Sequence, residues 1–139
     1  MKLRVKGNIA VIKGLDLANK RVESVVKNNL RDWAIDTERI AKSRVPVDTG
    51  ALKNSINAGT ANEGFTWKVG TNISYAPYVE FGTGGIVDVP AGLERYASDF
   101  KGKGIKEVNL PARAYLFNSA REEFLKMMQN LKKDLDKMK

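Results

Sequence analysis

Residues 16–44 read DLANKRVESVVKNNLRDWAIDTERIAKSR, and this stretch decides the fold. Its apolar residues recur at spacings of three and four, which is the period of one face of an α-helix. That face consists of Ala18, Val22, Val25, Val26, Trp33, Ile40 and Ala41. Asp16 can accept hydrogen bonds from the free N–H groups of the first turn, and Pro46 disfavours helical backbone at Val45. The stretch therefore predicts a long amphipathic helix from Asp16 to about Arg44.

Short strands are expected before this helix and after it. Apolar residues alternate with polar or small ones at Leu3 and Val5, and again at Ile9 and Val11, as in half-buried strands. Two further strands are expected at residues 55–58 and 65–69, joined by the polar hairpin loop of residues 59–64. In the second of them, alternation predicts one face with Phe65, Trp67 and Val69 and another with Thr66 and Lys68.

A second helix is expected at the C-terminal end. Ser119 and Glu122 have the spacing of a capping box, which predicts that this helix begins near Ser119. Its apolar positions again step by three or four and are Phe117, Ala120, Phe124, Met127, Leu131, Leu135 and Met138. These elements predict a single α+β domain over residues 1–139, in which the N-terminal and C-terminal helices pack on a small antiparallel sheet.

Two segments between the strands and the last helix have their own character. Residues 75–83 predict a single helical turn, with Pro77 at its first position and Gly82 at its left-handed end. Residues 84–110 show no clear period, and we interpret them as a long extended arm or loop that is buried against a neighbouring subunit. The apolar residues expected to make that contact are Ile86, Val87, Val89, Leu93, Tyr96, Phe100, Ile105 and Val108.

Composition argues against an enzyme. The chain has 139 residues, no cysteine and no histidine, which excludes thiol and imidazole chemistry and the common Cys/His zinc sites. Nucleotide-loop, hydrolase and metalloprotease motifs are absent from the sequence, so no cofactor, metal or small-molecule substrate is expected. No apolar run is long enough to cross a bilayer, and the first residues lack the apolar core of a secretion signal. We expect a protein made in the cytoplasm of its host, with no membrane contact.

Asp48 and Glu80 are the carboxylates that come closest to catalytic candidates, because both lie in turn-rich segments. A small hydrolase would need them to converge on a substrate, and nothing else in the sequence supports that. The favoured interpretation of Asp48 is a hydrogen-bond acceptor for backbone N–H groups in its turn. Glu80 could form an ion pair with Arg113, between subunits or within one chain, or could simply be solvated.

The net charge of +8 allows two interpretations. Solubility alone explains such a balance, and it is the favoured interpretation. The alternative is a nucleic-acid-binding accessory protein, since phosphates attract Lys and Arg without regard to base sequence.

Three segments, in this order, resemble the signatures of the head–tail joining, or tail-completion, family of long-tailed phages. Residues 45–56, VPVDTGALKNSI, are similar to the family pattern P-x-D-T-G-x-L-x-x-S-I. Val69-Gly70 followed by residues 75–83, YAPYVEFGT, resembles V-G then Y-A-x-x-V-E-F-G-T. Residues 111–116, PARAYL, resemble a proline–arginine–proline–aromatic–leucine run, with Ala114 in place of the second proline. The matching positions are Pro46, Asp48, Thr49, Gly50, Leu52, Ser55, Tyr75, Tyr78, Glu80, Phe81, Gly82, Thr83, Pro111, Arg113, Tyr115 and Leu116.

The resemblance implies a structural virion protein and no catalysis. It implies a subunit of the head–tail connector, or neck, located at the head–tail interface, which completes the tail and joins it to the DNA-filled head. The partners implied are copies of the chain in a ring, expected to be hexameric, and the neighbouring connector and tail-tube or tail-terminator proteins. The positive charge is compatible with non-specific contact to phage DNA in the channel.

Overall fold

The computed structural model describes residues 3–6, 16–82, 92, 95 and 111–138. The following elements occur in this part of the chain, in sequence order: β1 (Leu3–Lys6), α1 (Asp16–Arg44), α2 (Ala51–Ser55), β2 (Asn57–Ala61), the 3-10 turn η1 (Asn62–Gly64), β3 (Thr66–Gly70), α3 (Ala76–Phe81) and α5 (Leu116–Asp136).

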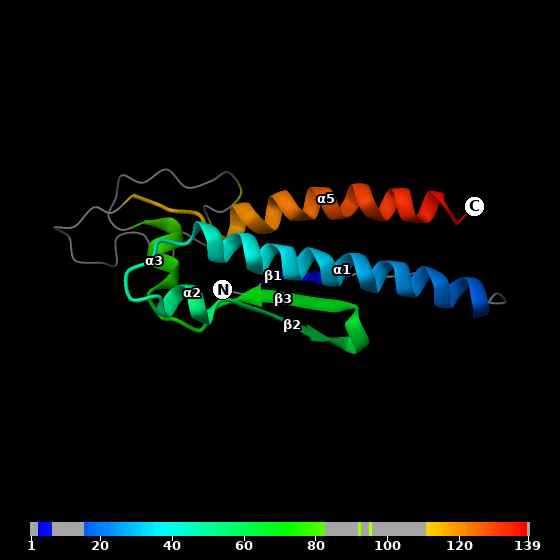
Figure 1. Cartoon of the computed structure of the whole chain (residues 1–139), viewed down its shortest axis with the longest axis horizontal. Coiled ribbons are helices and arrows are strands. Elements are labelled where there is room, and N and C mark those ends of the chain that lie inside the picture. The colour runs from blue at the N-terminus through cyan, green and yellow to red at the C-terminus, as the bar shows by residue number, and fades with distance from the viewer. Residues whose placement is uncertain (1–2, 7–15, 83–91, 93–94, 96–110, 139) are drawn as a thin grey trace.

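The described elements form three layers, with α1 in the middle (Figure 1). One side of α1 contacts the sheet, and the other contacts α5, which runs antiparallel to it. The predicted α+β class is therefore confirmed, and α1 has the bounds expected from its apolar stripe and from Pro46.

The sheet is antiparallel and has the order β1-β3-β2. Leu3 pairs with Val69 on one side of β3, and Ala58 pairs with the same residue on the other. The expected hairpin is present, but β2 runs to Ala61, so its second half was wrongly assigned to the loop. The connection is the short turn η1, in which Asn62 and Glu63 adopt positive φ angles of 52° and 54°. The strand expected around Ile9 and Val11 lies outside the described residues.

Alternation along β3 is only partly as predicted. Val69 is buried, but Thr66, assigned to the opposite face, is also buried at 2% exposure. Its hydroxyl accepts a hydrogen bond from Asn62 Nδ2 at 3.0 Å, which compensates for the burial of this polar group. Phe65 precedes the strand, and the Lys27 ammonium lies 4.4 Å from the centre of its ring, linking the hairpin to α1.

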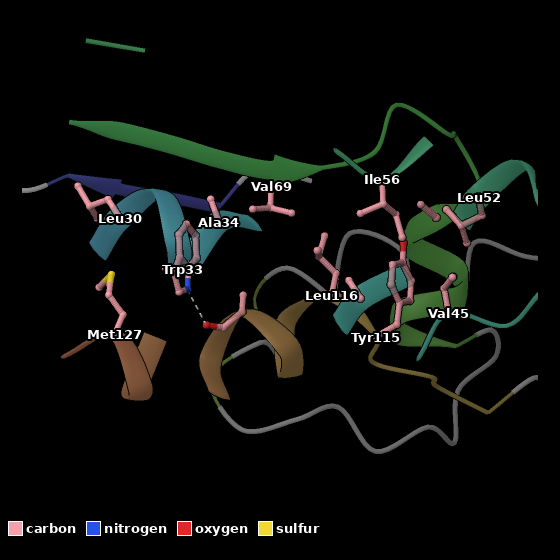
Figure 2. Packing of buried hydrophobic residues seen from close by; sticks show 13 residues of the cluster. Leu30, Trp33, Ala34, Val45, Leu52, Ile56, Val69, Tyr115, Leu116 and Met127 are labelled. Atoms are coloured by element: carbon pink, nitrogen blue, oxygen red, sulfur yellow. Dashed lines mark hydrogen bonds between the residues drawn. The ribbon is translucent and has the colours of Figure 1, made fainter. Parts of the chain in front are cut away.

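Trp33 is the central side chain of the core between α1 and α5. It is 2% exposed, and its Nε1 donates a hydrogen bond to the Ala120 carbonyl at 3.0 Å (Figure 2). Ala34 and Ala41 are fully buried on the same helix, where small side chains allow neighbouring elements to approach closely. The other buried apolar residues of the cluster are Leu30, Val45, Leu52, Ile56, Val69, Ala76, Tyr115, Leu116, Ala120 and Met127.

The start of α5 corrects the capping-box prediction. The helix begins at Leu116, so Ser119 is an interior position, and its hydroxyl donates to the Tyr115 carbonyl at 2.6 Å. Glu122 does not reach back to the helix start but pairs with Arg44 on α1 at 2.6 Å. The prediction was wrong because a residue from another element caps this helix. The arm residues Ile86, Val87, Val89, Leu93, Tyr96, Phe100, Ile105 and Val108 lie outside the described residues, as does Thr83.

Candidate interaction surface

The three motif-bearing segments meet at one end of the molecule. The first contributes α2, the second α3 and the third the start of α5, and all lie near the C-terminal end of α1 (Figure 1). The Arg113 N–H donates to the Val79 carbonyl at 2.9 Å, which joins the third segment to the second. Segments that are far apart in the sequence therefore form one structural unit.

Glu80 is the central polar residue of this unit. It lies on α3 with no exposed surface, and its carboxylate accepts the backbone N–H groups of Leu116 at 3.0 Å and of Phe117 at 2.9 Å. N–H groups in the first turn of a helix have no partner within that helix. Glu80 therefore caps α5 from a different element, a role that the sequence did not suggest.

The environment of Glu80 has opposing effects on its ionisation. Burial raises the pKa of the Glu80 carboxyl above its usual value, and the N–H groups of Leu116, Phe117 and Tyr115 oppose that shift. The ion pair with Arg113 is not formed within the chain, because the carboxylate points into the core and Arg113 is exposed. The inward position also removes Glu80 from the candidates for acid or base chemistry on an external substrate.

The first segment turns two of its motif residues inward. Leu52 is 4% exposed and belongs to the core cluster. The Ser55 hydroxyl donates a hydrogen bond to the Leu52 carbonyl at 2.8 Å. Because its proton is used in that bond, Ser55 Oγ accepts from the Thr71 hydroxyl, at 2.5 Å. Thr71 Oγ1 in turn accepts the Ile73 N–H at 3.1 Å. This chain of hydrogen bonds holds α2 against the loop that precedes α3.

The turn before α2 uses Thr49 and Gly50 rather than Asp48. The Thr49 hydroxyl accepts the Ala51 N–H through a long hydrogen bond of 3.4 Å. Gly50 has a φ of +81°, a conformation that glycine adopts without a steric cost. Asp48 is exposed, and within the described part of the chain its carboxylate accepts no hydrogen bond. The acceptor role predicted for Asp48 is thus filled by its neighbour.

Phe81, Tyr115 and Leu116 are packed inside the same unit. Each is at most 3% exposed, and the Phe81 ring lies 5.8 Å from that of Phe117, centre to centre. The Tyr115 hydroxyl is buried without a hydrogen-bond partner among the described residues. Burial raises the pKa of the Tyr115 phenol, and the nearby charge of Glu80 adds to that effect. This side chain is a packing residue and not a reactive group.

Gly82 ends α3 with a positive φ, as expected, but not in the left-handed helical conformation. Its φ of +78° is combined with a ψ of 175°, so the chain leaves the helix extended. A side chain at this φ would be strained, which explains why glycine suits the position.

The remaining motif residues line an open groove on the surface of this unit. Its volume is about 350 Å³, and its walls are Pro46, Tyr75, Tyr78, Val79, Pro111 and Arg113. The walls come from all three segments and are apolar except for the guanidinium group and the phenol hydroxyls. Tyr75 is 45% exposed, and Val47, which follows Pro46, is 61% exposed. An apolar groove with exposed aromatic and aliphatic neighbours is typical of a protein-contact site.

The two carboxylates considered as catalytic candidates are separated in the structure. Asp48 lies on the surface and Glu80 in the core, so the described structure does not bring them together as an acid–base pair. No group of three or more acidic, cysteine or histidine residues in the described ranges could hold a metal ion. Among the described helices, none is both long and apolar enough to cross a membrane.

A comparison with models of protein families identifies one match. Residues 9–82 match the HK97-gp10-like family, whose description is "Bacteriophage HK97-gp10, putative tail-component". The match contains α1, the sheet hairpin and α3, which is more than half of the chain. This protein is a member of the HK97-gp10-like family. Searches of curated proteins and of solved structures found no match.

Membership defines the class of the protein. An HK97-gp10-like chain is a structural tail component of a phage virion and not an enzyme. Its associates are accordingly other tail proteins of the virion. The first motif segment, and the second as far as Gly82, fall within the matched residues. Pro111 to Leu116 follow the match in sequence and join these segments in the folded structure.

Proposed function

We propose that this HK97-gp10-like protein is a subunit of the ring that completes the phage tail and joins it to the DNA-filled head. The ring is proposed to contain six copies and to contact the neighbouring connector and the tail-tube or tail-terminator proteins. The observation that carries the proposal is the open apolar groove built from all three motif segments. Family membership supports the tail as its location.

The distribution of roles among the motif residues favours this proposal. Three of them are buried and stabilise the unit from inside: Glu80, Leu52 and Tyr115. Three other motif residues instead reach the surface, where they line the apolar groove: Tyr75, Pro111 and Arg113. Stability of the unit does not require an apolar groove at this place. A subunit with a rigid frame and an apolar contact site fits assembly into a larger particle.

The test is removal of the protein from the assembling phage. Loss of the gene product should leave DNA-filled heads and tails that do not join, or tails without a normal end, when lysates are imaged by electron microscopy. Adding the purified protein to such a lysate should restore infectious particles. Joined, infectious particles without the protein, or its absence from the mass spectrum of mature particles, would overturn the proposal.

The alternative is a DNA-binding accessory role, motivated by the net charge of +8 and by two adjacent lysines on α5. Lys132 and Lys133 are exposed there, and neither forms an ion pair within the described part. Binding to duplex DNA that weakens steeply with salt would support this alternative, because displaced counterions give that dependence. A chain that is not retained on DNA at about 50 mM salt would exclude it.

A further inference from the structure

The exposed large apolar side chains of the described part fall mainly into two places. Val47 and Tyr75 lie beside the groove, at 61% and 45% exposure. Leu125 and Met128 lie on α5, at 60% and 46% exposure. Isolated exposed apolar residues are ordinary, but a pair one helical turn apart forms a patch.

The patch on α5 continues to a carboxylate. Glu122, Leu125 and Met128 are spaced by three, so they lie along one face of the helix. The residues that pack on α1, among them Ala120 and Met127, occupy the opposite face. We call Glu122, Leu125 and Met128 the α5 ridge, a convex apolar strip with an acidic end. Its carboxylate is half exposed even though it pairs with Arg44.

The groove has the complementary character. It is concave and apolar, and among its described walls the cationic residue is Arg113. Its volume of about 350 Å³ is near the lower end, roughly 300 Å³, of pockets that hold small ligands, so it suits two side chains better than a whole helix. The ridge offers two such side chains, with a carboxylate next to them for the guanidinium group.

The two surfaces cannot meet within one chain. α5 is one continuous helix from Leu116, next to the groove, and a rise of about 1.5 Å per residue places Leu125 roughly 14 Å further along the axis. We infer that the α5 ridge of one copy docks into the groove of the next copy. This inference rests on the proposed ring and names the surfaces that close it. Because the two patches differ, the contact is head-to-tail, and its repetition generates the proposed ring when the rotation between copies closes.

Site-specific disulfide formation tests the contact. Because the chain has no cysteine, every disulfide must form between the introduced residues. Tyr75→Cys and Leu125→Cys are made as separate full-length variants, both at exposed positions. Mixed and oxidised, they should give a disulfide-linked dimer, whereas each variant alone should not. The double variant should give a ladder of linked chains on a denaturing gel. Leu125→Asp should weaken self-association about 30-fold or more, as does the loss of a hot-spot residue.

The matched control is Ile35, which is 49% exposed on α1 and belongs to neither surface. Tyr75→Cys mixed with Ile35→Cys should give no dimer, and Ile35→Asp should leave self-association unchanged. Equal cross-linking through Ile35→Cys, or dimers of Leu125→Cys with itself, would overturn the inference. So would a disulfide that forms only within single chains of the double variant.

The failure of this inference is distinguishable from failure of the proposed function. A ring detected by native mass spectrometry but without Tyr75–Leu125 disulfides would reject the docking surfaces and leave the ring intact. A chain that stays monomeric at its highest soluble concentration, and forms no disulfide between copies, would also reject them. Neither result bears on the imaging of phage particles, which tests the role in tail completion directly.

Discussion

The carboxylate of Glu80 in α3 accepts the backbone N–H of Leu116, 36 residues further along the chain, at a distance of 3.0 Å. Together with the bond to Phe117, this contact fixes the start of α5 relative to α3. The groove lies at the same junction, since Val79 and Arg113 are among its walls. The buried carboxylate therefore helps to position the groove without lining it.

Replacing Glu80 by alanine should destabilise the protein strongly. The change removes the acceptor of two backbone N–H groups at the start of α5, of which that of Leu116 is buried and that of Phe117 partly buried. A fully buried N–H group without an acceptor costs about 1–3 kcal/mol. We expect the free energy of unfolding in urea to fall by about 2–4 kcal/mol. Glu80→Gln, which retains one acceptor, should lose less. Glu122→Gln, an exposed control on α5, should change little, and equal losses for Glu80→Ala and this control would contradict the capping role.

The stability contributed by Glu80 should depend on pH. Burial raises the pKa of this carboxyl in the folded protein, so folding favours its protonated form. Its contribution is then fully present below the unfolded pKa and is lost as the pH rises through the folded value. Wild type should therefore gain stability relative to Glu80→Gln as urea unfolding is moved from pH 7 to pH 5. A difference that shrinks towards low pH would mean that the N–H groups outweigh burial.

Glu38 should behave in the opposite sense. Burial alone would raise its pKa, but the hydrogen bonds from Lys42 and from the Ala58 N–H hold it below its usual value. This contribution is present above the unfolded pKa and is lost as the pH falls through the folded value. The Ala58 bond, at 2.7 Å, occupies an N–H on edge strand β2. Glu38→Ala should lower the free energy of unfolding by about 1–2 kcal/mol at pH 7. Asp36→Ala is the control and should change little, because it removes only a half-exposed ion pair with Arg39.

The long helices and the hairpin were predictable because local periodicity determines them. The apolar stripe that includes Val26 and Trp33 predicted where α1 lies, and the alternation of apolar and polar residues predicted where β3 lies. The capping-box error at Ser119 arose because a local pattern was assigned a role that Glu80 fills from another element. Such a partner is set by tertiary contacts that one sequence does not reveal.

The candidate surface was predictable only in part for a related reason. The resemblance identified the residues that line the groove, but not which of them face outward. Tyr75 and Tyr115 look equivalent as motif aromatics, yet one is 45% exposed and the other 1%. Burial depends on how α3 and α5 pack, and that packing is fixed by the Glu80 contacts rather than by the local pattern.

Two glycines form a matched pair for testing the turn before α2. Gly50 has a φ of +81°, and a Cβ there would meet only Asn54 Nδ2 at 3.7 Å, so strain and not crowding is the obstacle. Gly50→Ala should lower the free energy of unfolding by about 1 kcal/mol. Gly59 lies in β2 with an ordinary φ and open space around its Cβ position. Gly59→Ala should therefore be neutral or slightly stabilising, and a larger loss at Gly59 than at Gly50 would contradict the argument.

Tyr115→Phe should stabilise the protein, although Tyr115 is a motif residue. Its hydroxyl is buried and has no hydrogen-bond partner among the described residues. Burying an unpaired hydroxyl costs about 1–3 kcal/mol, so its removal should raise the free energy of unfolding by about 1 kcal/mol while the ring keeps its packing. Tyr75→Phe, at an exposed position, should be neutral and serves as the control. A loss of stability in Tyr115→Phe would show that the hydroxyl finds a partner in solution, such as a bound water near α2.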